Sequence, residues 1–166
     1  MTDPHEVTMS RYFAAPPELV YRAFTDPEQL SQWVGPLMFT VPVDSVSVDA
    51  RADGHWRFTM VGKDDPIWRA PVDLSLTEVV ENRLLVGYEV AQGFPGLEDG
   101  TEMILSIELI AEGDGTRLEL RQGPLPDEMR ELSAIGWSQA FAKLDGLLAT
   151  PAKYRNNPAT YEGDRE

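Results

Sequence analysis

The 166-residue chain contains no cysteine, only two histidines and no long apolar run. The absence of cysteine excludes disulfide bonds, thiolate catalysis and zinc–thiolate sites within this sequence. The histidines, His5 and His55, lie in separate segments and are too few to predict a catalytic triad or a metal site. Because no apolar run approaches the roughly 18 residues of a membrane-crossing helix, the sequence predicts no membrane span.

Basic residues are also scarce. The lysines are Lys63, Lys143 and Lys153, and the formal net charge is −14. Such a negative field repels phosphate backbones, so we expect no nucleic-acid partner. The first four residues lack the basic and apolar regions of a signal peptide, and we therefore expect a cytoplasmic protein. No motif predicts a metal or another cofactor, and we expect none.

A hydrophobic content of 42% is enough for one core. The chain contains no internal repeat and no linker between candidate domains. We therefore expect a single domain over residues 1–150, followed by a polar tail over residues 151–166.

The longest helical pattern runs from about Asp127 to Leu148, between Pro126 and Pro151. Proline punctuation predicts these limits. The apolar face is wide, so we expect this helix to lie in a concave partner rather than on a flat one. That face consists of Met129, Leu132, Gly136, Trp137, Ala140, Phe141, Leu144, Leu147 and Leu148.

Three small residues, Ser133, Gly136 and Ala140, lie at the middle of this helix. A glycine there costs roughly 1 kcal/mol of helix propensity relative to alanine. Either a neighbouring backbone comes close to Gly136, or the glycine leaves space open for a ligand.

The N-terminal segment alternates as a strand from His5 to Phe13 and then becomes helical over Glu18–Phe24. A second helix begins directly afterwards, because Pro27 suits the first helical position. Thr25 or Asp26 is the expected N-cap of this second helix.

After residue 37 the apolar period changes to two, which predicts antiparallel strands in a meander, with the N-terminal strand pairing at one edge. Pro71 places its region at a sheet edge or in a bulge. The predicted strands are Ser45–Ala50, His55–Val61, Ile67–Leu76, Arg83–Val90, Glu102–Ala111 and Thr116–Arg121.

Alternation assigns an apolar and a polar face to this sheet. The apolar face includes Val48, Trp56, Phe58, Met60, Trp68, Val72, Leu74, Leu84, Val86, Tyr88, Met103, Leu105 and Leu118. The polar face includes His55, Arg57, Asp73, Glu89, Glu108 and Glu119.

Several short blocks resemble one known family. They are Ala15-Pro16, Val20-Tyr21, Phe24-Thr25-Asp26-Pro27-Glu28, Leu30, Trp33 with Gly35-Pro36, Asp49 with Arg51 and Gly54, Trp56-Arg57, and Gly136-Trp137 with Leu144. Together they are similar to the activator-of-heat-shock-protein-90-ATPase homologue-like family of the START-like superfamily. The chain departs from the family pattern at His55 and at Ala70-Pro71, so the shape of any cavity is its own.

The resemblance implies an α+β, helix-grip fold. In this fold a curved antiparallel sheet wraps around a long C-terminal helix, two short helices follow the first strand, and a cavity lies between sheet and helix. The expected function is a binding module for a small apolar or amphipathic molecule. Two alternatives stay open: a chaperone-associated interaction domain, and a cavity enzyme of the aromatase/cyclase type. Since few ionisable residues are expected to face inward, we predict no catalytic residue.

The expected ligand-binding residues are those that face the cavity in this arrangement. They are Trp56, Phe58, Met60, Trp68, Tyr88, Met103, Leu105, Ser133, Gly136, Trp137, Ala140 and Phe141. Arg11, Asp49 and Arg51 are possible polar anchors. Arg11 could hold a ligand carboxylate, but a salt bridge at the rim is the preferred interpretation. Asp49 and Arg51 are preferred as a structural pair.

Overall fold

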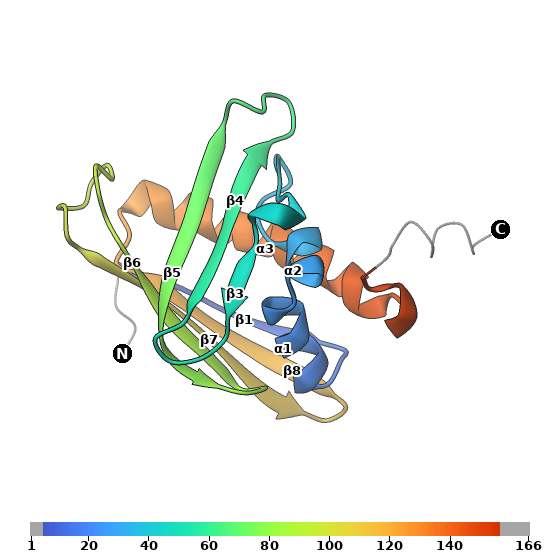
Figure 1. Ribbon diagram of the computed structural model, residues 1–166. Helices are drawn as coiled ribbons and strands as arrows, with labels where there is room; N and C mark the ends of the chain where they lie inside the picture. Colours follow the sequence, from blue (N-terminus) through green and yellow to red (C-terminus); the bar gives the residue numbers. More distant parts are fainter. Residues whose placement is uncertain (1–4, 157–166) are drawn as a thin grey trace.

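The computed structural model describes residues 5–156. One antiparallel sheet of eight strands curls around a long C-terminal helix, and two short helices follow the first strand (Figure 1). The predicted α+β, helix-grip fold is confirmed. No helix within residues 5–156 is both long enough and apolar enough to cross a membrane.

The sheet has the order β1-β8-β7-β6-β5-β4-β2, and β3 also pairs with β4. The N-terminal strand lies at one edge, as predicted. The strands are β1 (Val7–Phe13), β2 (Phe39–Thr40), β3 (Ser47–Asp49), β4 (His55–Gly62), β5 (Arg69–Val80), β6 (Leu84–Val90), β7 (Glu102–Glu112) and β8 (Gly115–Gly123). The helices are α1 (Pro17–Thr25), α2 (Pro27–Trp33) and α3 (Asp127–Ala149), with short 3₁₀ helices η1 (Val43–Ser45) and η2 (Ala152–Tyr154).

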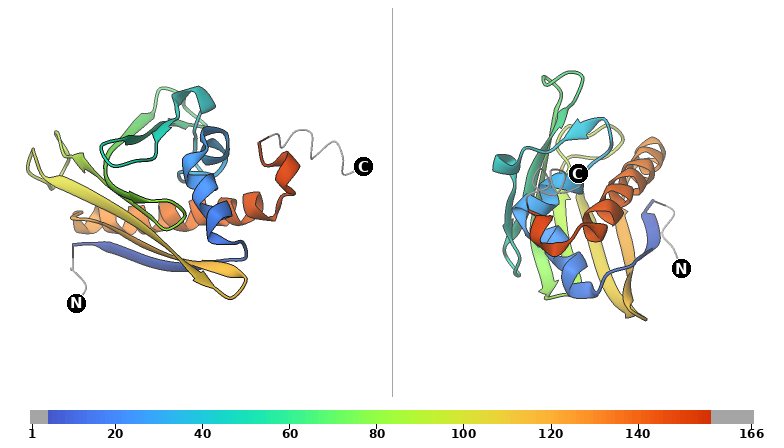
Figure 2. Two further views of the ribbon diagram at one scale, coloured as in Figure 1. Left: turned by 60° about the horizontal axis from the view of Figure 1, so that its bottom comes forward. Right: turned by 90° about the vertical axis from the view of Figure 1, so that its right-hand side faces the viewer.

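Asp26 ends α1 and begins α2. Its side chain accepts a hydrogen bond from the backbone N–H of Glu28 at 3.0 Å, so it is the N-cap of α2, one of the two caps predicted. The indole N–H of Trp33 donates to the carbonyl oxygen of Ala23 at 2.9 Å. This bond holds α2 back against α1, and both helices lie beside the C-terminal half of α3 (Figure 2).

Aromatic rings fill the space where these three helices meet the sheet. Phe13 of β1 packs edge-on against Phe141 of α3, with 5.6 Å between ring centroids. Trp33 lies 4.7 Å from Phe24 and 6.2 Å from Phe141, again between centroids. We call the cluster of Phe13, Phe24, Trp33 and Phe141 the closed end of the fold. All four side chains are buried.

The strands β5 and β6 separate before they end. Their pairing runs from Val80 and Leu84 to Ser75 and Tyr88, with a register shift between Glu78 and Leu76. In the described sheet, residues 69–74 of β5 pair with β4 alone. Figure 1 shows the β4–β5 hairpin projecting away from β6 at this point. Pro71 lies in this one-sided stretch, which agrees with its predicted edge position.

The register also corrects the predicted face of β6. Leu85, Gly87 and Glu89 pair with residues of β7 that face α3, and Glu89 is opposite Met103. Tyr88 and the other residues of its phase therefore lie on the outer face, opposite to the prediction. Both phases of this strand contain apolar residues, so alternation alone does not distinguish them.

The segment after α3 packs against the closed end. Tyr154 is buried. The side chain of Asn156 donates to Asp26 at 3.0 Å and accepts from Gln29 at 3.1 Å. Of the polar tail predicted for residues 151–166, residues 157–166 lie outside the described part of the chain.

Candidate ligand-binding cavity

A cavity of about 280 Å³ lies between the N-terminal half of α3 and the concave face of the sheet. This volume is near the lower limit of ligand sites, which hold roughly 300–1,000 Å³, so it suits a small molecule. The apolar lining residues from the sheet are Trp56, Phe58, Met60, Val72, Leu74 and Leu105. The lining residues from α3 are Met129, Leu132, Ser133, Gly136, Trp137 and Ala140.

The small side chains of α3 leave space here, and the connection after α2 packs against the helix at Gly136. A Cβ atom added to Gly136 would lie 3.2 Å from Cγ of Pro36. Gly136 therefore lets the Pro36 ring approach the helix closely, and it borders the cavity as well. Its close neighbour is this proline side chain and not a strand backbone.

One polar cluster joins α3 to β8 at the cavity wall. The indole N–H of Trp137 donates to Oε1 of Gln122 at 3.0 Å, and the hydroxyl of Ser133 donates to the same oxygen. Because an indole N–H can only donate, the amide oxygen of Gln122 must face α3. The NH₂ group of Gln122 meets no acceptor within residues 5–156 and can donate to a ligand.

A single charged side chain, Glu89, lines the cavity among residues 5–156. Its Oε2 accepts a hydrogen bond from the backbone N–H of Asp73 at 3.1 Å, across the gap where β5 and β6 separate. Burial is the main cause of a raised pKa of the Glu89 carboxyl; the negative charge of Asp73 raises this pKa further, and the hydrogen bond opposes both.

The cavity stops at a layer formed by Trp56, Leu74 and Leu105. The same three residues border a void of only about 10 Å³ on the far side, toward the closed end. The indole N–H of Trp56 donates to the carbonyl oxygen of Phe24 at 2.8 Å, which fixes this ring between the two spaces. The larger of the two spaces thus lies beside the N-terminal half of α3, and the smaller one lies toward the closed end.

Eight of the twelve predicted ligand-binding residues line the cavity. They are Trp56, Phe58, Met60, Leu105, Ser133, Gly136, Trp137 and Ala140. Their role in binding stays a prediction.

The other four predicted residues lie elsewhere. Trp68 is 67% exposed and belongs to the β4–β5 connection, because the chain turns between Asp65 and Trp68 before β5 begins. Tyr88 faces outward, because the pairing of β6 with β7 places Glu89 and not Tyr88 on the inner face. Phe141 belongs to the closed end. Met103 packs against the core but does not form part of the cavity wall.

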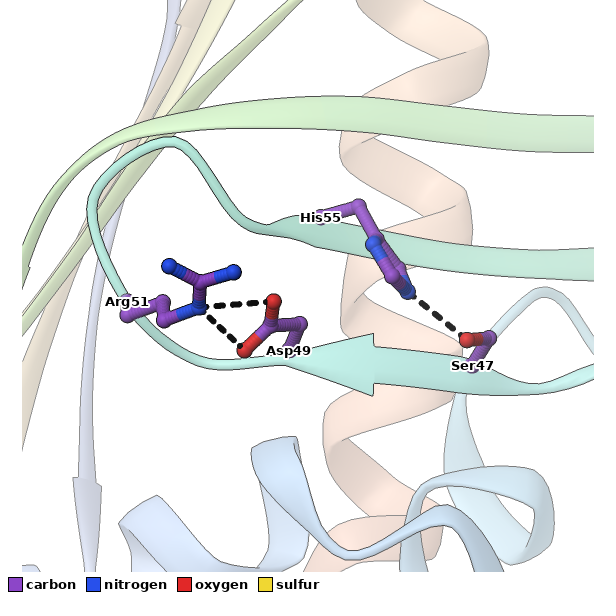
Figure 3. A network of polar contacts seen from close by, with 4 residues as sticks. All are labelled: Ser47, Asp49, Arg51 and His55. Carbon is purple, nitrogen blue, oxygen red and sulfur yellow. Dashed lines mark hydrogen bonds and ion pairs between the residues drawn. The ribbon is translucent and has the colours of Figure 1, made fainter.

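The three possible polar anchors form ion pairs away from the cavity. Arg11 pairs with Asp145 of α3, as the salt-bridge interpretation predicted. Nε of Arg51 lies 3.0 and 2.8 Å from the two carboxylate oxygens of Asp49 (Figure 3). None of the three lines the cavity.

Sequence reasoning missed Glu89, Gln122 and Pro36. Glu89 was assigned to the polar face, because a carboxylate beside Tyr88 in an alternating strand suggests a solvated position. Gln122 follows the predicted end of its strand at Arg121. Extending the alternation of Leu118 and Leu120 by one step would have placed Gln122 on the inner face. No three His, Asp or Glu side chains gather within residues 5–156 in a way that could hold a metal ion.

Comparisons with known proteins agree with this architecture. A crystal structure of a Chromobacterium violaceum protein is 27% identical, covers 88% of this chain and 98% of its own, and superposes with a TM-score of 0.76. The AHSA1 protein of Silicibacter pomeroyi is 26% identical, with coverages of 87% of this chain and 97% of its own and a TM-score of 0.71. A Nitrosomonas europaea protein shares the fold at 24% identity, with coverages of 89% and 96% and a TM-score of 0.72.

No curated protein matches the chain. The sequence profile described as "Activator of Hsp90 ATPase homolog 1-like protein" matches residues 14–149. That range includes both short helices, seven of the eight strands and the whole of α3. The chain therefore belongs to the activator of Hsp90 ATPase homolog 1-like family.

Proposed function

We propose that this protein binds a small apolar or amphipathic molecule in the cavity between α3 and the sheet. One observation carries the proposal. A cavity of about 280 Å³ with mostly apolar walls lies next to a packed region whose void holds only about 10 Å³. Apolar walls gain free energy when a ligand removes them from water, at roughly 25 cal/mol for each Å² covered.

The polar groups of the cavity support binding with a defined orientation. Ligand sites are typically apolar with a few placed polar groups. Glu89 and the NH₂ group of Gln122 supply an acceptor and a donor in separate parts of the wall. The ligand in this proposal is therefore amphipathic, with its apolar body against Trp56 and Trp137.

The test fills the cavity from the sheet side. Val72→Phe replaces an aliphatic side chain of the cavity wall with a larger aromatic ring. Val80→Phe makes the same change at an exposed position of the same strand. We expect the fluorescent apolar probe N-phenylnaphthylamine to bind the parent and Val80→Phe, and to bind Val72→Phe at least tenfold more weakly, since overpacking excludes it. Equal binding to both variants would place the probe site elsewhere.

Native mass spectrometry of the freshly purified parent complements this test. A retained small molecule would identify the chemical class of the ligand directly. Its loss in Val72→Phe and retention in Val80→Phe would assign it to the cavity.

A cavity enzyme is a second candidate, and Glu89 favours it. The expectation that ionisable side chains do not face inward was wrong at this position, and a carboxyl with a raised pKa in a cavity can serve as a general acid or base. Turnover of a bound molecule that is lost in Glu89→Gln, while binding persists, would favour the enzyme.

The family description favours a chaperone-associated role as a third candidate. This role needs a surface and not a cavity, so Val72→Phe would leave it intact. A saturable rise in the ATPase rate of heat-shock protein 90, unchanged in Val72→Phe, would support the chaperone role over ligand binding.

A further inference from the structure

The charge of the cavity wall is one-sided. Glu89 is negative, and among residues 5–156 no arginine, lysine or histidine lines the cavity. The basic residue that sequence reasoning offered as a carboxylate anchor, Arg11, is paired with Asp145 outside it. A ligand carboxylate would therefore meet a like charge and find no cation to offset its desolvation.

The carboxylate of Glu89 has binding capacity left over. Its Oε2 replaces a missing strand partner for the N–H of Asp73, at 3.1 Å. A carboxylate has two oxygens and about four lone-pair sites, so Oε1 is available to a further donor. A glutamine could satisfy the same backbone N–H; the negative charge is more than this structural task requires.

Neighbouring charges do not neutralise Glu89. Arg57 lies on the outer face, where its Nε is 2.8 Å from Oδ1 of Asp73. Asp73 itself is negative and acts on Glu89 by repulsion. Among residues 5–156 no cation pairs with Glu89, so a cation that entered the cavity would meet a partly desolvated carboxylate. Hydrogen bonds between ionised groups are roughly twice as strong as neutral ones.

The second polar point, Gln122, is separated from Glu89 by one strand. Glu89 is paired with Met103 of β7, and Gln122 is paired with Leu105, two residues further along. Strand spacings place the two Cα atoms roughly 12 Å apart. A small molecule that donates to Glu89 therefore places its apolar body between Glu89 and Gln122, against the rings of Trp56 and Trp137.

We propose that the cavity selects small apolar molecules that carry an amine, which donates to Glu89, and discriminates against the corresponding carboxylates. This inference rests on the proposed function and specifies the chemistry of its ligand. Glu89 is the residue that determines this specificity.

The test uses three probes with one apolar body: naphthylmethylamine, naphthalenemethanol and naphthoate. Dissociation constants are measured by NMR titration at neutral pH and physiological salt, which screens the field of distant surface charges. We expect the amine to bind at least about tenfold more tightly than naphthoate, with the alcohol in between.

Two variants with the same change of net charge separate the cavity from the surface. Glu89→Gln keeps an acceptor for Asp73 and removes the charge, so we expect the amine-to-naphthoate affinity ratio to fall by about tenfold. Glu108→Gln removes a carboxylate from the exposed outer face of β7, and we expect it to leave the ratio unchanged. In the parent, the carboxyl carbon signal of Glu89 should shift on addition of the amine; this readout does not depend on any variant folding.

The outcomes separate the inference from the proposed function. Equal affinities for the three probes, tighter binding of naphthoate, or an unchanged ratio in Glu89→Gln would overturn amine selection and leave cavity binding standing. Failure of all three probes to bind the parent would overturn both.

Discussion

The two halves of α3 lie in the same curled sheet but have opposite surroundings. The C-terminal half carries Phe141 and Leu144, which are fully buried among the rings of the closed end. The N-terminal half carries Ser133 and Gly136 and borders a cavity of about 280 Å³. One helix thus serves as a packed core element at one end and as a cavity wall at the other.

Two structural causes produce this difference. The short helices α1 and α2 lie beside the C-terminal half of α3, where Trp33 packs against Phe141 (Figure 2). At the other end the pairing of β5 with β6 stops at Ser75 and Tyr88, so the sheet does not close over α3 there. The difference teaches that the packed core of this fold and its cavity occupy separate stretches of the same elements.

The largest expected effect compares the same substitution at the two ends of α3. Leu144→Ala should lower the free energy of unfolding by about 2–5 kcal/mol, because it leaves a void among fully buried side chains. Leu132→Ala, at a cavity-wall residue that is 62% exposed, should cost under about 1 kcal/mol. Denaturant unfolding measures both. Similar losses would show that the N-terminal half is packed as tightly as the core.

The two glycines of α3 sharpen the comparison. A Cβ atom at Gly146 has no neighbour within 4 Å outside the helix backbone. Gly146→Ala should therefore stabilise the protein by up to about 1 kcal/mol through helix propensity. Gly136→Ala should gain less, because its Cβ atom would press on Pro36 at 3.2 Å. Equal gains in thermal denaturation would mean that Pro36 yields without cost.

The smallest expected effect is the pH dependence contributed by Glu89. Its raised pKa means that folding favours the protonated carboxyl, so its contribution to stability is complete below the unfolded-state pKa and is lost as pH rises through the folded-state pKa. Glu89→Gln should therefore gain thermal stability relative to the parent between about pH 4 and pH 7. The charged groups near the Glu89 carboxyl are Asp73 and Arg57, and Arg57 forms an ion pair with Asp73.

A control for this titration is Glu108→Gln, which removes an exposed carboxylate. Its melting temperature relative to the parent should not change over the same pH range. The prediction fails if the melting temperature of Glu89→Gln, relative to the parent, falls as the pH rises from about 4 to about 7. That result would mean that the surroundings of Glu89 favour its charged form.

Local signals predicted the helices because each depends on few residues, whereas the helix-grip arrangement was implied by the family resemblance. Proline at the start of α1 and α2, the cap at Asp26 and the wide apolar face of α3 all act within one or two turns of helix. They identified the short helices and the limits of α3 to within a residue. With the helix-grip arrangement, the apolar face of α3 predicted most of the residues that α3 contributes to the cavity wall.

The polar wall of the cavity could not be predicted in the same way. The face of Glu89 depends on the pairing of β6 with β7, which alternation within β6 does not reveal. The separation of β5 from β6 is a property of the whole sheet. Trp68 was misplaced because an apolar side chain at a strand end looks the same in sequence whether it turns inward or stays in the connection.

The pairing of the first strand with the last has a consequence for synthesis of the chain. Val7 is paired with Gln122, and Phe13 packs against Phe141, so the partners of β1 are made last. Until residue 141 has left the ribosome, β1 lacks its contact with α3, and the Phe13 ring remains exposed on the nascent chain. Completion of the native fold therefore waits for synthesis of α3, and it proceeds through contacts between residues more than a hundred positions apart, the kind that slows folding.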